Sequence, residues 1–178
     1  MGRLIYLLNV SLDGFVETVD RSLDWTVVDD ELHGWFNEHA RGIAASLYGR
    51  RLWEVMSAYW PTADTDPSAT ATMREFGEIW RATPKVVFAS GPVTLVGNAR
   101  LAAGDVVEEL ARVRAEVDGD IEVAGPTLAA EYVRRDLVDV YRLVVHPVIL
   151  GSGTPFFPSL AAPLQLRLTE TRAFASGA

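Results

Sequence analysis

Apolar residues follow two different spacings in alternation along the chain. Nearly continuous apolar runs of strand length lie at residues 4–10, 43–48, 85–89, 121–124 and 138–145. Helical spacing, in which apolar residues recur every three or four positions, occupies residues 29–40, 50–58, 68–81 and 105–117 and resumes at Pro126. Strands that alternate with helices predict an α/β domain whose largely parallel sheet is covered on both faces.

Two further segments carry weaker patterns. Residues 61–67 contain proline and aspartate and predict a loop between two helices. In residues 164–174, Leu164, Leu166 and Leu168 alternate with polar residues, which predicts a final strand. We expect this strand to form a hairpin-like antiparallel pair at the C-terminal end of the chain.

Length and composition narrow the class of protein. The 178 residues fit one domain over residues 1–178, without an internal repeat or linker. The chain has no cysteine, which excludes a disulfide scaffold, and its three histidines lack the spacing of metal ligands, so we expect no metal site. No apolar run approaches 18 residues and no secretory cleavage site follows the first strand, which predicts a cytoplasmic protein.

The net charge of −8 disfavours nucleic acids and anionic membranes as partners. The acidic excess is uneven, however. Residues 1–40 hold eight acidic and two basic residues, whereas the other 138 hold sixteen acidic and fourteen basic residues. A site for a small anion is therefore expected after residue 40.

The end of the first predicted strand is the first candidate site. Asn9, Val10 and Ser11 end the strand, and Asp13 and Gly14 follow. Because open α/β sheets bind ligands beyond the carboxyl ends of their strands, this segment predicts a ligand-binding loop anchored by Asp13. The alternative is an Asx-type turn in which Asp13 bonds to nearby backbone.

Two other strands end at a glycine that leads directly into a helix. Gly49 precedes Arg50, Arg51 and Leu52. Basic residues are unfavourable at the positive end of a helix unless an anion is bound there, so this turn predicts a phosphate site. The alternative is that the arginines pair with acids such as Glu54.

The second glycine turn consists of Gly125, Pro126, Thr127 and Leu128. Its helix N-terminus could hold a diphosphate, although a single glycine does not make the Gly-x-Gly-x-x-Gly fingerprint. The alternative is a tight turn without a ligand. Among other residues, Trp60 could line a pocket for a flat ring or fill the core. His146 ends an apolar strand and either faces the same cleft or is a core histidine.

Six motifs in order carry a family resemblance: Ser11-Leu12-Asp13-Gly14, Gly49-Arg50, Lys85-Val86-Val87-Phe88, Gly125-Pro126-Thr127-Leu128, Leu137-Val138-Asp139, and the run from His146 to Phe157. Together they resemble the dihydrofolate reductase superfamily. The closer resemblance is to the branch related to the C-terminal reductase domain of the bifunctional deaminase–reductase of riboflavin synthesis.

The resemblance implies a three-layer α/β/α fold with a mixed, mostly parallel central sheet, and a homodimer. It also implies a nicotinamide dinucleotide cofactor, typically NADPH, with NADH as the other option. The turns at residues 49–52 and 125–128 would then hold the dinucleotide, with Ser90 near its adenosine end and Asn9, Val10 and Ser11 beside the nicotinamide.

A reductase of this kind passes a hydride to a C=N or C=C–C=O centre, and a proton must reach the neighbouring atom. Asp13 and Asp30 are the candidate catalytic carboxylates, and Asp13, Trp60 and His146 are the candidate substrate contacts. Their acidic surroundings favour a neutral or cationic heterocycle, pterin- or aminouracil-like, as substrate.

Two departures from the family pattern support an alternative. Leu52 stands where the family usually has threonine, and Gly91 follows Ser90 where a basic or hydroxyl residue is common. Arg51 is the candidate to compensate. The alternative is a catalytically idle, nucleotide- or flavin-binding homodimer of the same fold.

Overall fold

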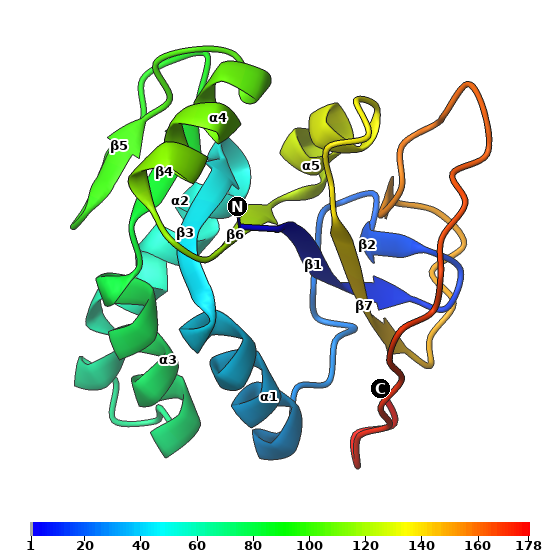
Figure 1. The fold of residues 1–178 in the computed structure, drawn as a ribbon. Helices are drawn as coiled ribbons and strands as arrows, with labels where there is room; N and C mark the ends of the chain where they lie inside the picture. The colour runs from blue at the N-terminus through cyan, green and yellow to red at the C-terminus, as the bar shows by residue number, and fades with distance from the viewer. Residues whose placement is uncertain (1) are drawn as a thin grey trace.

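The computed structural model describes residues 2–178, and its centre is a six-stranded sheet in the order β5-β4-β3-β6-β1-β7 (Figure 1). Every pairing in this sheet is parallel. The strands are β1 (Leu4–Ser11), β3 (Ile43–Gly49), β4 (Lys85–Phe88), β5 (Ala99–Leu101), β6 (Asp120–Ala124) and β7 (Val140–His146). The α/β prediction is thus confirmed, and the described central sheet is fully parallel where a mixed one was expected.

Helices cover both faces of the sheet, as the predicted three-layer arrangement requires. The helices are α1 (Asp30–Arg41), α2 (Arg50–Tyr59), α3 (Ala71–Ala82), α4 (Val106–Glu116) and α5 (Pro126–Val133). One face packs against α4 and α5 through buried residues of alternate strand positions, such as Leu47 and Val123. The other face meets α2 and α3 through Tyr48, Val87 and Ala124. This alternation follows from the period of two along each strand.

The antiparallel pairing lies in a separate small sheet. It joins β2 (Phe15–Glu17) to β8 (Thr154–Pro155), next to the carboxyl end of β1. The predicted strand over residues 164–174 is wrong, because this segment is irregular throughout and Leu168 is 79% exposed. A strand needs a neighbouring strand for its N–H and C=O groups, and no strand of the described residues pairs with this segment. The expected C-terminal hairpin is wrong for the same reason, and the segment instead returns to α1, where Arg172 pairs with Glu31.

The expected loop at residues 61–67 is partly helical. Trp60–Thr65 form a 3₁₀ helix, and α3 begins at Ala71, later than the predicted residue 68. Thr70 caps α3 by accepting a hydrogen bond from the N–H of Met73. Proline near the start of a short helix is favourable because its missing N–H would be unpaired there in any case.

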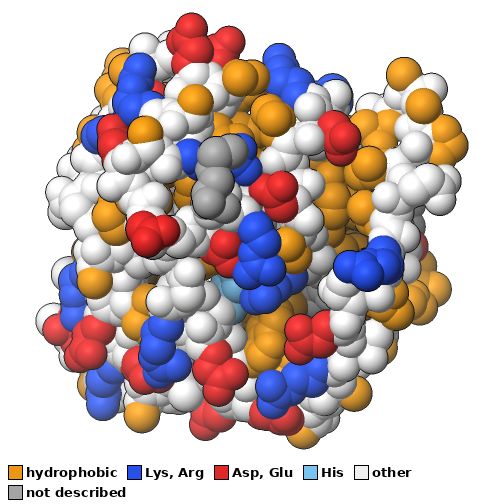
Figure 2. Space-filling model, in the orientation of Figure 1, with side chains coloured by type: hydrophobic (Ala, Val, Ile, Leu, Met, Phe, Trp, Pro, Cys, Tyr) orange, Lys and Arg blue, Asp and Glu red, His pale blue; other side chains and the backbone are white. Residues whose placement is uncertain are grey.

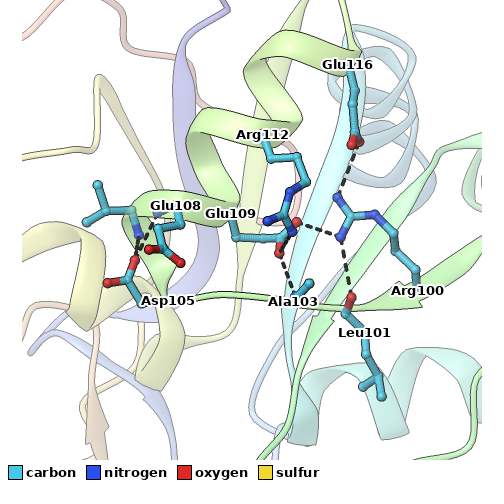
Figure 3. Close-up of polar contacts among 9 residues, drawn as sticks. Arg100, Leu101, Ala103, Asp105, Glu108, Glu109, Arg112 and Glu116 are labelled. Atoms are coloured by element: carbon cyan, nitrogen blue, oxygen red, sulfur yellow. Dashed lines mark hydrogen bonds and ion pairs between the residues drawn. The ribbon is translucent and has the colours of Figure 1, made fainter.

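A buried carboxylate joins the sheet edge to α4 (Figure 3). Glu109 is fully buried and accepts from the backbone N–H of Ala103, and it pairs with Arg100 at 2.6 Å and Arg112 at 2.9 Å. Burial alone would raise the pKa of Glu109, but these donors hold it below its ordinary value. Arg100 also reaches Glu116, so this network fixes β5 against α4.

Acidic and basic side chains are intermingled over the face shown in Figure 2, without an extended basic stripe. Among residues 2–178, no helix is both long and apolar enough to cross a membrane.

Candidate functional site

A cavity of about 920 Å³ lies between the sheet and helices α1, α2 and α3. The strands contribute the side chains that point away from α4 and α5. These are Leu7 and Asn9 on β1, Ser46 and Tyr48 on β3, and Glu122 and Ala124 on β6. Apolar residues of the helices face them, among them Phe36, Met56 and Phe76. The cavity therefore has a largely apolar wall with a few polar groups, as is typical of small-molecule sites.

The two predicted glycine turns meet at the edge of this cavity. Gly49 ends β3 and Gly125 ends β6, two neighbouring strands. A Cβ atom at Gly125 would lie 3.5 Å from Cβ of Leu52, and one at Gly49 would lie 3.4 Å from Cβ of Leu128. The turns thus pack against each other. Gly125 also has φ +107°, a conformation that side chains strongly disfavour.

These turns begin the two α-helices of residues 2–178 that lack a side-chain cap. Asp29, Thr70 and Asp105 accept hydrogen bonds at the starts of α1, α3 and α4. Gly49 and Gly125 provide no such acceptor for α2 and α5. Since the first N–H groups of a helix have no partner within the helix, these two N-termini can donate to an anion in the cavity.

The two arginines of the first turn have different surroundings. Arg51 lies 2.6 Å from the carboxylate of Glu17, which also accepts from the hydroxyl of Thr154. Burial alone would raise the pKa of Glu17, but Arg51 and Thr154 hold it below its ordinary value. Arg51 therefore joins α2 to the small sheet.

Arg50 pairs with Glu54 at 2.7 Å, one helical turn on, and both side chains are about half exposed. A Cβ atom at Gly91 would lie 3.4 Å from Nη1 of Arg50. Arg50 is thus beside the segment after β4 in which Ser90 was expected to approach the adenosine end. Arg51, which the sequence suggested as the compensating residue, points instead to Glu17.

Most of the predicted cofactor contacts line the cavity, and two do not. The residues that line it are Asn9, Gly49, Arg50, Arg51, Leu52, Ser90, Gly125, Pro126, Thr127 and Leu128. Val10 belongs to the core on the opposite face. Ser11 bonds locally: its hydroxyl donates to Asp13 and accepts from the N–H of Phe15.

The predicted catalytic carboxylates lie away from the cavity lining. Asp13 is exposed and accepts from the Ser11 hydroxyl and from the N–H groups of Leu150 and Gly151. These donors, chiefly Ser11, hold the pKa of Asp13 below its ordinary value. Asp13 therefore ties the loop after β1 to residues 150 and 151, which differs from the Asx-type turn to nearby backbone that the sequence left open. Asp30 is exposed at the start of α1 and accepts from the hydroxyl of Thr72.

Of the predicted substrate contacts, Trp60 lines the cavity, and His146 is buried behind Asn9. The backbone N–H of Val27 lies 3.4 Å from Nδ1 of His146, which must therefore accept. Nε2 then carries the proton and donates to Oδ1 of Asn9 at 2.9 Å. The amide hydrogens of Asn9 are left for the cavity. Desolvation lowers the pKa of His146, in keeping with a neutral ring.

Sequence reasoning missed several polar residues of the cavity. Glu17, His39, Ser46, Tyr48 and Glu122 all line it. Glu122 had the clearest signal, because it is a charged residue between the apolar residues Ile121 and Val123 in the middle of a central strand. A charge at such a position needs a partner or a polar cavity.

Comparison with known proteins identifies the family to which this chain belongs. The chain is 30% identical over 176 residues to the uncharacterized protein YyaP of Bacillus subtilis strain 168, a match that covers 98% of this chain and 90% of YyaP. It superposes on a predicted riboflavin biosynthesis protein from Shewanella sp. PV-4 with a TM-score of 0.77 and 17% identity, over 99% of this chain and 94% of the other.

Two further solved structures share the fold. One is the diaminohydroxyphosphoribosylaminopyrimidine deaminase/5-amino-6-(5-phosphoribosylamino)uracil reductase of Thermotoga maritima, with a TM-score of 0.64 and 18% identity, over 95% of this chain and 52% of that one. The other is the dihydrofolate reductase of Enterococcus faecalis complexed with NADP(H), with a TM-score of 0.56 and 16% identity, over 90% of this chain and 79% of that one.

The fold is therefore that of the dihydrofolate reductases. Residues 3–178, nearly the whole chain, match the RibD C-terminal domain, and the protein belongs to that family.

Proposed function

We propose that this protein is an NADPH-dependent reductase of a small heterocyclic or related C=N or C=C substrate. The observation that carries the proposal is the pair of uncapped helix N-termini, at Gly49 and Gly125, which pack together beside a largely apolar cavity. Family membership supports a reductase, and the E. faecalis relative in fold is complexed with NADP(H).

The residues present fit a dinucleotide. The free N–H groups at the starts of α2 and α5 suit a diphosphate, and the absence of side chains at both glycines lets the two turns pack together, which brings these N–H groups to one edge of the cavity. Arg50, beside Ser90 and Gly91, is the cation available to a 2′-phosphate. Arg51 is paired with Glu17, which is largely buried, whereas Arg50 is paired with Glu54 in a half-exposed pair that a phosphate can displace. Arg50 is therefore the residue expected to favour NADPH over NADH.

Within this proposal the bound nicotinamide supplies the hydride, and the protein aligns the two reacting rings and excludes water from them. Asn9, fixed by His146, offers its amide hydrogens to an acceptor at the nicotinamide end. The ring of Trp60 and the side chains of Met56 and Phe76 form an apolar wall against which a flat ring can pack. Excluding water and aligning two rings supplies much of the rate enhancement in such reactions.

Fluorescence titration with NADPH and NADH tests the proposal. We expect saturable binding of both and tighter binding of NADPH. Replacement of Arg50 by alanine should weaken NADPH binding by about 10–100-fold, the size of a charged hydrogen bond, and leave NADH binding nearly unchanged. Arg41→Ala, which removes an exposed arginine paired with Glu75, is the control. Absence of saturable binding of either nucleotide would contradict the proposal.

The alternative, an idle nucleotide- or flavin-binding protein of the same fold, is favoured by Leu52, which packs on Gly125 and offers no hydroxyl to a phosphate. The two are separated by incubating the purified protein with NADPH and candidate C=N substrates. Substrate-dependent loss of absorbance at the reduced nicotinamide band supports the reductase, and a yellow preparation supports a flavin binder.

A further inference from the structure

Glu122 is a carboxylate without a donor. It lines the cavity from the middle of β6, and its side chain is only 19% exposed. Among residues 2–178 it accepts no hydrogen bond, and Nε2 of His39 lies 3.5 Å from its Oε1. The side chain is partly exposed to the cavity, so its carboxylate oxygens are open to a donor that enters there.

Arg142 determines which atom His39 presents to Glu122. Nη1 of Arg142, on β7, lies 2.6 Å from Nδ1 of His39. A guanidinium can only donate, so Nδ1 accepts and the ring proton of a neutral His39 is on Nε2. Nε2 is buried and has no hydrogen-bond partner within 2–178, and the His39 side chain is 5% exposed. The polar edge of His39 therefore faces Glu122 and helps to hold it.

Other charged groups around the cavity do not neutralise Glu122 by contact. Lys85 and Glu122 flank Ser46 in adjacent strands. The ammonium of Lys85 instead donates to the carbonyls of Trp80 and Thr83 and to Asn98. Arg142 is directed at His39. Tyr48 accepts from the indole N–H of Trp80, which leaves its own O–H free beside the same wall.

We propose that Glu122 binds the substrate of this protein through a cationic nitrogen or paired N–H donors, and that His39 is its positioning residue. The proposal rests on the proposed function, since it assigns the substrate end of the same cavity. A carboxylate accepts two parallel N–H bonds from an amidine-like group and repels an anion. The substrate class is thus a planar amino-substituted or amidine-bearing heterocycle, and acidic substrates are excluded at this end.

Three ring compounds of matched size test the charge requirement. Benzamidine is cationic with paired N–H donors, benzamide is neutral, and benzoate is anionic. In saturation-transfer NMR titrations of the wild-type protein, benzamidine should bind most tightly, benzamide more weakly and benzoate most weakly. Glu122→Gln should weaken benzamidine binding by about 10–100-fold and change benzamide binding less than about twofold, because only the charged bond is lost.

Glu38→Gln is the matched control, because Glu38 is on the same helix as His39 and is exposed. It should change none of the three affinities. Glu122→Asp keeps the charge but shortens the side chain by one methylene, so its loss of benzamidine affinity should be smaller than that of Glu122→Gln. It also serves as the test variant if Glu122→Gln does not fold. His39→Ala should weaken benzamidine less than Glu122→Gln does.

Two results would overturn the proposal: no saturable benzamidine binding to the wild-type protein, or equal benzamidine affinity in the wild-type and Glu122 variants. NADPH affinity, measured on the same variants, should change less than about twofold. Absence of NADPH binding to the wild-type protein would instead reject the proposed function. Failure of the Glu122 proposal and failure of the proposed function are therefore distinguishable.

Discussion

Asn9 and His146 show how a buried residue can determine what a cavity residue offers. The ring of His146 accepts from Val27 and donates to Asn9, so the amide oxygen of Asn9 is used and its hydrogens remain for a ligand. The sequence placed both residues near the site but could not assign the direction of these bonds. That direction depends on Val27, which lies 119 residues away in sequence from His146.

His146 also predicts a pH effect on stability. Desolvation lowers its pKa in the folded protein below the ordinary value of 6.5. The unfolded chain therefore binds the proton first as the pH falls through 6.5, and the free energy of unfolding should decrease. Urea unfolding of the wild-type protein at pH 7.5 and at pH 5.5 measures this decrease.

His146→Gln is the comparison, because glutamine can still donate to Asn9 but does not titrate. The variant should lose stability less steeply than the wild-type protein between pH 7.5 and pH 5.5. Equal slopes for the two proteins would show that His146 does not contribute.

At the scale of elements, the strand and helix positions followed from periodicity wherever an element had a buried face. Residues 105–117 predicted a helix, and α4 spans Val106–Glu116 with Leu110 and Val113 buried. Residues 164–174 showed an equally regular alternation, but no strand forms there. Alternation describes the side chains, whereas a strand also needs a neighbouring strand for its backbone, which sequence pattern alone does not supply.

The turn at Gly125 carries the sharpest prediction at this scale. Gly125→Ala should lower the free energy of unfolding by about 1–3 kcal/mol, because alanine is strained at φ +107°. Chemical denaturation measures the change. Gly34→Ala, in the middle of α1 with open space around it, should instead stabilise the protein by up to about 1 kcal/mol. An unchanged free energy of unfolding in Gly125→Ala would mean that the backbone of the turn relaxes to accommodate alanine.

For the whole molecule, the net charge of −8 does not by itself exclude the proposed site for a small anion. The acidic residues that dominate residues 1–40 are largely engaged: Asp29 caps α1, Glu17 pairs with Arg51, and Asp13 holds a turn. Figure 2 shows both signs of charge intermingled. Local helix ends and Arg50 therefore decide anion binding in the proposed site, and the net charge does not.

The oligomeric state of the protein can be predicted from the edge of its sheet. We expect a homodimer, as the family resemblance implies. β7 is an edge strand of the described sheet, and its Leu143 and Val145 are exposed. Covering such an edge with a second copy would satisfy both its backbone groups and its apolar side chains. Light scattering after size exclusion should give about twice 19.5 kDa. A mass near 19.5 kDa at all concentrations would contradict the expectation.

The sequence by itself determined the α/β class and the two glycine turns, because periodicity and glycine act over neighbouring residues. The tertiary structure decided which carboxylate faces the cavity. Asp13 accepts from the N–H groups of Leu150 and Gly151, and Asp30 accepts from the hydroxyl of Thr72, so both are engaged away from the cavity lining. Glu122 and His39 are 83 positions apart in sequence and meet only in the folded protein. Contacts between elements depend on the order of the strands in the sheet, and a local sequence pattern does not determine that order.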